Sequence, residues 1–203
     1  MKNNRIKSIL MRPEISTLIM FIVIMTGFFI ANDKFLSPRN IRIVMGITPE
    51  YIIVAIGIAI LMISGEFDLS VGSVFALVPM TMVQLVHQGI PPWFAIALGL
   101  SIGIAVGFVN GFITLRFGIP SFIATLGMLY IARSLTTVAT GGFPPPFPHS
   151  LPNELFVFQF EVFRASLFWM LGVAAIAGIM LHRSNLGNWI YATCLLYTSD
   201  AAD

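Results

Sequence analysis

Long apolar stretches recur along this chain and constrain its fold more than any other feature of the sequence. A helix needs about 20 mainly apolar residues to cross roughly 30 Å of hydrocarbon. Six segments qualify or nearly do: Ile15–Ala31, Ile41–Ile63, Val71–Val86, Trp93–Leu115, Phe122–Val138 and Leu167–Leu181. They are continuous, whereas barrel strands alternate over about ten residues. We therefore predict an all-α, polytopic transmembrane helix bundle with about six spans in this fragment. Pro49 and Glu50 interrupt the apolar run of the second segment early.

The composition favours lipid over water as the surrounding solvent. Of 203 residues, 57% are hydrophobic and 10% are charged, whereas soluble domains carry about a quarter charged residues. A net charge of +2 is too weak and too scattered for a nucleic-acid partner. The single cysteine, Cys194, cannot form a disulfide within the chain. No zinc motif, phosphate-binding loop or nucleophile elbow is present, so we expect no catalytic, metal or cofactor residue here.

Basic residues near the ends of the apolar segments predict the topology. Residues 1–14 carry Lys2, Arg5, Lys7 and Arg12, and this places a short N-terminal segment in the cytoplasm. Counting spans then places Arg116 and Arg183 inside as well. Three cations disagree because they fall outside: Lys34, Arg39 and Arg42. The first apolar run ends without a small-residue cleavage site, so we expect a retained span and no signal peptide.

Polar residues gather between the second and third apolar segments, in the stretch 64–73. An ionisable group costs about 2.5 kcal/mol or more at the bilayer centre, yet this stretch holds Glu66 and Asp68. One interpretation is structural: Asp68 or Ser70 caps the helix that begins near Val71. The other is functional: Glu66 and Asp68 line a pathway or contact a partner subunit.

A second pattern lies in the fourth apolar segment, where small residues repeat at intervals of four. Gly99, Gly103 and Gly107 precede Asn110, and small residues at this spacing let helix backbones approach closely. The pattern favours a packing face with Asn110 hydrogen bonding across it. The alternative is that Asn110 lines a pore and meets a polar solute.

Two stretches outside the spans also carry predictions. Prolines exclude a helix at 141–148, and four aromatic side chains that follow predict an interfacial layer or a docking surface for an external partner: Phe156, Phe158, Phe160 and Phe163. Residues 187–192 are expected to begin a cytoplasmic loop. Residues 194–203 do not continue the apolar pattern and resemble translated adapter sequence, so we interpret them as an artefactual tail on a chain that is naturally longer.

Several motifs together resemble the ribose/xylose/arabinose-type permeases of the branched-chain amino acid/sugar permease superfamily. Residues 64–73 read SGEFDLSVGS and are similar to the family's SGGIDLSVGS. Residues 119–127 read IPSFIATLG and are similar to IPPFIATLG, and residues 107–111 match its GxxNG. The resemblance covers residues 15–193, which it identifies as the N-terminal part of a transmembrane permease domain. Glu66, Phe67 and Ser121 depart from the pattern, and Glu66 adds a charge.

The resemblance implies a transport subunit that performs no enzymatic chemistry. It implies the membrane-spanning permease of an ATP-binding-cassette importer for a monosaccharide or related small polar solute, in the bacterial inner membrane. The implied partners are a second permease subunit, a cytoplasmic ATPase that binds the ATP, and a periplasmic sugar-binding protein. Six residues are candidates for translocation or subunit contact: Glu66, Asp68, Ser70, Ser73, Asn110 and Thr125.

Two other functional classes were weighed against the importer. A secondary transporter driven by an ion gradient would need acidic or histidine side chains deep in its spans, whereas Glu66 and Asp68 lie at a junction between spans. A membrane-embedded enzyme would need a convergent set of nucleophile, base or metal ligands, and the sequence shows none.

Overall fold

The computed structural model describes residues 13–148, 150–152, 158–160 and 163–199. The start of the predicted cytoplasmic segment, Phe156 of the aromatic stretch and the last four residues lie outside this part. The chain divides into two compact units, Met1–Thr48 and Pro49–Asp203. Both cavities described below are lined by residues of the second unit.

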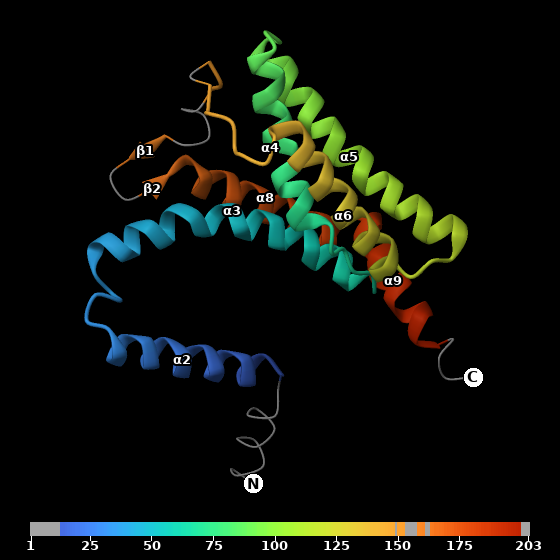
Figure 1. The fold of residues 1–203 in the computed structure, drawn as a ribbon. Helices are drawn as coiled ribbons and strands as arrows, with labels where there is room; N and C mark the ends of the chain where they lie inside the picture. Colours follow the sequence, from blue (N-terminus) through green and yellow to red (C-terminus); the bar gives the residue numbers. More distant parts are fainter. Residues whose placement is uncertain (1–12, 149, 153–157, 161–162, 200–203) are drawn as a thin grey trace. The chain divides into compact units, whose positions relative to one another are not determined.

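Helices make up nearly all of the described structure (Figure 1). In chain order they are α2 (Pro13–Ala31), α3 (Pro38–Ile63), α4 (Val71–His87), α5 (Pro92–Phe117), α6 (Ser121–Thr140), α8 (Ala165–Arg183) and α9 (Asn185–Ser199). Between α6 and α8, β1 (Gln159–Phe160) pairs antiparallel with β2 (Phe163–Arg164). The predicted all-α class is confirmed, with this two-residue ladder as a minor addition.

Each of the six predicted spans corresponds to one helix of the structure. Four helices, α3, α5, α6 and α8, are long and apolar enough to cross a bilayer. The apolar parts of α2 and α4 are shorter, and α4 has 17 residues. The loop expected at residues 187–192 is wrong, because these residues belong to α9.

Prolines and a glycine mark several of the helix ends. Pro38 and Pro92 are the first residues of α3 and α5, where the missing N–H would have had no partner in the helix. The left-handed Gly118, with φ of 66°, ends α5. Pro49 and Glu50, which interrupt the apolar run in the sequence, lie inside α3, which runs continuously through both. Membrane helices tolerate internal prolines when neighbouring groups satisfy the freed backbone.

The tightest packing joins α4 to α6 and to α5 (Figure 1). A Cβ atom added at Gly99 would collide with the Met82 side chain, and one at Gly103 would lie 3.3 Å from Val78 Cγ2. Gly107 has open space around it. The predicted close-packed face is therefore confirmed at Gly99 and Gly103 and wrong at Gly107.

Large apolar side chains cover the outside of the helices as well as the inside. On α5 alone, Ile104, Phe108 and Leu115 are 74%, 72% and 85% exposed. Soluble monomers rarely expose continuous apolar patches of this kind. Lipid removes the cost of such a surface, so these helices are those of an integral membrane protein.

Candidate functional site

The connection between α3 and α4 is irregular backbone that lies deep between its neighbours. It leaves α3 at the left-handed Gly65, with φ of 87°, a conformation that a side chain would strain. Its contacts reach Asn110, seven residues before the end of α5, and Thr125, four residues after the start of α6. At 1.5 Å per residue, the Leu69–Ser70 end of the connection lies roughly 6 to 10 Å inside the ends of those helices, whereas Phe67 lies level with Ser121, the first residue of α6.

Asp68, Ser70 and Asn110 form a continuous hydrogen-bonded chain. Asp68 Oδ1 accepts the Ser70 backbone N–H at 2.7 Å and the Ser70 hydroxyl at 2.6 Å. The Ser70 oxygen in turn accepts from Asn110 Nδ2 at 3.0 Å. Because the single hydroxyl hydrogen of Ser70 goes to Asp68, Asn110 must present its NH₂ group to Ser70. The predicted hydrogen bond of Asn110 across the helix interface is confirmed.

A second pair of side chains, both on α6, holds the connection from the opposite side. Ser121 Oγ accepts the Phe67 backbone N–H at 3.1 Å, and Thr125 Oγ1 accepts the Leu69 N–H at 3.1 Å. The Thr125 hydroxyl donates within its own helix to the Ser121 carbonyl at 2.7 Å. Side chains of α5 and α6 thus replace the partners that a helix would have given the connection.

The capping interpretation for this segment needs correction. Ser70 does occupy the N-cap position of α4, but its side chain makes no capping hydrogen bond. Its hydroxyl is committed to Asp68 and Asn110. Asp68 instead bonds the amide two residues ahead, which is an Asx-type turn leading into the helix.

A cavity of about 380 Å³ opens beside this connection. Four of the six predicted site residues line it: Glu66, Asp68, Asn110 and Thr125. Asn110 is 5% exposed, and its Oδ1 has no hydrogen-bond partner among the described residues. Ser70, which is fully buried, and Ser73, half-buried in the first turn of α4, do not line the cavity.

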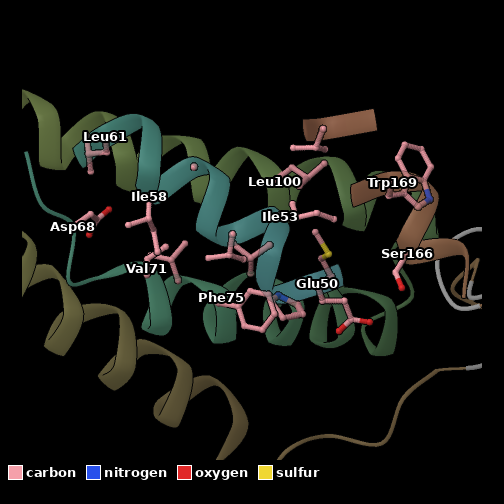
Figure 2. A pocket seen from close by; sticks show the side chains of 17 residues that line it. Glu50, Ile53, Ile58, Leu61, Asp68, Val71, Phe75, Leu100, Ser166 and Trp169 are labelled. Atoms are coloured by element: carbon pink, nitrogen blue, oxygen red, sulfur yellow. The ribbon is translucent and has the colours of Figure 1, made fainter. Parts of the chain in front are cut away.

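A larger cavity of about 880 Å³ extends between α3, α4, α5 and α8. Leu61 and Asp68 line both cavities and therefore separate them. Figure 2 shows Asp68 and Leu61 at one end of the larger cavity, with Glu50, Ser166 and Trp169 at the other. Along α3, Glu50 and Leu61 lie roughly 16 Å apart at 1.5 Å per residue.

The far end of the larger cavity holds Ser166 and Trp169, which the sequence did not single out, beside Glu50 and Arg164. Glu50 Oε1 lies 3.6 Å from Arg164 Nη1, and Ser166 is 6% exposed. In the sequence, Ser166 and Trp169 are inconspicuous because they stand within an apolar segment. Their three-residue spacing, which places them on one helix face, was the available signal.

Both cavities combine mostly apolar walls with a few groups that can form hydrogen bonds. Carboxylate and amide oxygens accept from hydroxyl groups, and apolar walls surround a small number of such groups, as in ligand pockets generally. In the described part of the chain, no three His, Cys, Asp or Glu side chains cluster to hold a metal.

Known proteins resemble the chain over most of its length. The family described as the permease component of the branched-chain amino acid transport system matches residues 40–195. The xylose/arabinose import permease protein of Sulfolobus acidocaldarius is 30% identical over 92% of this chain and 54% of its own. The ribose import permease protein of Escherichia coli K12 is 30% identical over 88% and 57%, and that of Bacillus subtilis 32% over 80% and 51%.

The matched relatives are longer than this chain. The chain spans about half the length of the curated relatives it matches. No solved structure matches it significantly.

Proposed function

We propose a specific task for this chain, which belongs to the family of permease components of branched-chain amino acid transport systems. It is the membrane-spanning subunit of an importer that moves a monosaccharide or a related small polar solute across the bacterial inner membrane. The sugar import permeases named among its relatives support a sugar over an amino acid as the solute. The subunit binds and passes its solute without changing it covalently.

One observation carries this proposal: the irregular connection that follows Gly65 is held by side chains of α5 and α6 and borders two cavities. Non-helical backbone inside a bilayer is tolerated where protein buries it or where it lines a water-filled space. In transporters, broken helices of this kind form the solute site. Here Asp68 borders both cavities, and Asn110 Oδ1 is a buried acceptor without a partner among the described residues.

The energy for transport comes from a separate chain. A cytoplasmic ATPase subunit binds the ATP, a second permease subunit completes the pathway, and a periplasmic binding protein delivers the solute. ATP binding must favour one conformation of the permease pair over the other, because a ligand shifts an equilibrium only by its difference in affinity. No cofactor is assigned to this chain.

Uptake by the complete importer in proteoliposomes tests the proposal. We expect labelled sugar to enter only when ATP and the binding protein are both present, and a panel of pentoses, hexoses and polyols should identify the solute. Uptake driven by a pH gradient alone would contradict the proposal and favour a secondary transporter.

A further inference from the structure

We propose that the end of the larger cavity farthest from Asp68 is a second binding site for a neutral, ring-shaped polyhydroxylated solute. It is built by Ser166, Trp169 and the Glu50–Arg164 ion pair. This inference rests on the proposed function and adds to it a specific place, roughly 16 Å along α3 from Leu61, where the solute is held before it reaches Asp68.

Ser166 supplies the observation that points to a ligand. It is the second residue of α8 and is 94% buried, given its 6% exposure. Ser166 lines the cavity, and its hydroxyl has no hydrogen-bond partner among the described residues. A buried hydroxyl without a partner costs about 1 to 3 kcal/mol. A solute hydroxyl in the cavity would remove that cost, because the Ser166 oxygen both donates and accepts.

Trp169 supplies a flat apolar surface beside this hydroxyl. It lies one helical turn after Ser166, so both side chains are on the same face of α8. Figure 2 shows both at the same end of the cavity. Trp169 is 47% exposed. The C–H face of a sugar ring packs on an aromatic ring, so this pairing of an aromatic surface with a hydroxyl suits a cyclic polyol.

The ion pair at the same end determines the charge of the ligand. Glu50 Oε1 and Arg164 Nη1 are 3.6 Å apart, and Glu50 lines the cavity. A carboxylate only accepts and a guanidinium only donates hydrogen bonds, so the pair offers both kinds of partner to hydroxyl groups. Because the two charges cancel, the site favours neither an anion nor a cation.

The remaining lining fits the same ligand class. It is aliphatic or aromatic over most of its area, as at Val78, Phe75 and Val173. Pockets for small molecules are mostly apolar with a few placed polar groups, and about 880 Å³ lies within their usual range of roughly 300 to 1,000 Å³.

The fluorescence of Trp169 gives a direct binding measurement. Trp93 and Trp189 are 62% and 69% exposed, so Trp93→Phe and Trp189→Phe leave Trp169 as the sole tryptophan of the chain in lipid nanodiscs. We expect titration with D-ribose or D-xylose to change its emission saturably. Ser166→Ala should weaken the apparent affinity roughly five- to tenfold.

A matched serine provides the control. Ser101 is exposed, and its hydroxyl bonds the Ala97 carbonyl of its own helix at 2.8 Å, so Ser101→Ala should leave the affinity unchanged. Equal affinities for the Ser166→Ala and Ser101→Ala variants would overturn the site. So would the absence of any saturable change while circular dichroism shows an intact helical fold.

A lipid tail is the competing occupant of an apolar cavity. Phospholipids brominated on the acyl chain quench nearby tryptophans, and in our account added sugar should reduce quenching of Trp169. Quenching that sugar leaves undiminished would show that an acyl chain fills the cavity, and this also would overturn the site.

The site and the proposed function fail in different ways. Normal ATP-driven uptake by the complete importer carrying Ser166→Ala and Trp169→Phe, together with no saturable change of Trp169 emission in the protein that retains only this tryptophan, would reject the site alone. Sugar binding at Trp169 together with uptake that ignores ATP would reject the importer and retain the site.

Discussion

The two ends of the larger cavity differ in how their polar groups are held. At the end near Asp68, here called the clasped end, Asp68 and Ser70 are linked by hydrogen bonds to each other and to Asn110, whose Oδ1 alone has no partner among the described residues. The end near Ser166, here called the loose end, has fewer such bonds. The clasped end has Ser70 fully buried between Asp68 and Asn110, with Thr125 and Ser121 bonding the backbone alongside. The loose end has a partly exposed ion pair and the Ser166 hydroxyl, which has no partner among the described residues.

The difference distinguishes polar groups that stabilise the fold from polar groups that are available to a ligand. Buried hydrogen bonds that are fully satisfied stabilise one arrangement of the backbone. A buried polar group without a partner destabilises the empty protein and favours whatever satisfies it. Substitutions at the clasped end should therefore reduce stability, whereas substitutions at the loose end should change binding and leave stability nearly intact.

The largest expected effect is that of Asp68→Ala. It removes the acceptor for the backbone N–H and the hydroxyl of Ser70, and we expect the free energy of unfolding to fall by about 3 kcal/mol. Asp68→Asn, which keeps an oxygen acceptor, should recover most of this loss. Glu66→Ala is the matched control, expected within about 0.5 kcal/mol of the parent. Steric trapping in bicelles measures the free energy of unfolding of all three variants. Equal losses for Glu66→Ala and Asp68→Ala would show that the hydrogen bonds of Asp68 do not hold the connection.

A packing substitution should follow in size. Gly99→Val places a branched side chain against Met82 on α4, and such overpacking costs about 1 to 3 kcal/mol. Gly107→Val, on the same helix in open space, should cost less than about 1 kcal/mol. The same unfolding assay compares the two variants. A larger loss of unfolding free energy for Gly107→Val than for Gly99→Val would show that α4 and α5 are not in contact at Gly99.

Thr125→Val should have a smaller effect confined to one amide. The change keeps the shape of the side chain but leaves the Leu69 N–H without its acceptor, at about 1 to 2 kcal/mol. Hydrogen exchange at the Leu69 amide should become faster. Thr136→Val is the control, because that hydroxyl bonds only the Ala132 carbonyl of its own helix, at 2.8 Å. Similar exchange at Leu69 in both variants would show that Thr125 does not hold the connection.

Glu50→Gln should have the smallest effect on stability, since it lies at the loose end. The Glu50 and Arg164 side chains are 46% and 23% exposed, and ion pairs in such settings contribute about 1 kcal/mol or less. A double-mutant cycle with Arg164→Gln measures the coupling between the two residues. A coupling above about 2 kcal/mol would remove the distinction between the two ends of the cavity.

The sequence was sufficient for the helices but not for the second cavity. Apolar runs of span length are a strong local signal, so all six spans fall on helices. The hydrogen-bonded site around Asp68 and Asn110 was partly predicted as well, because polar side chains are costly inside a membrane segment. The Ser70 hydroxyl bonds Asp68 and Asn110 and therefore does not cap α4. Asn110 lies on another helix, so a capping rule based on neighbouring residues could not predict this.

The loose end was not predicted as a site because Ser166 and Trp169 have no local signature. Arg164 and Ser166 are two residues apart, whereas Glu50 comes from a distant part of the chain, and only the tertiary fold brings it close to them. Pro49 and Glu50 interrupt the apolar pattern of the second segment, but α3 continues through both. Residues 194–203 remain a sequence-based prediction of an artefactual tail.

The accessibility of the connection to water tests the central claim most directly. In a Cys194→Ser background reconstituted in liposomes, a cysteine is introduced by Glu66→Cys, beside the smaller cavity, and in a second protein by Ile104→Cys, on the exposed apolar face of α5. If the connection lines a water-filled pathway at membrane depth, a polar thiol reagent should label position 66 at least tenfold faster than position 104, and sugar should slow that labelling. Equal, slow labelling at the two positions would contradict the account.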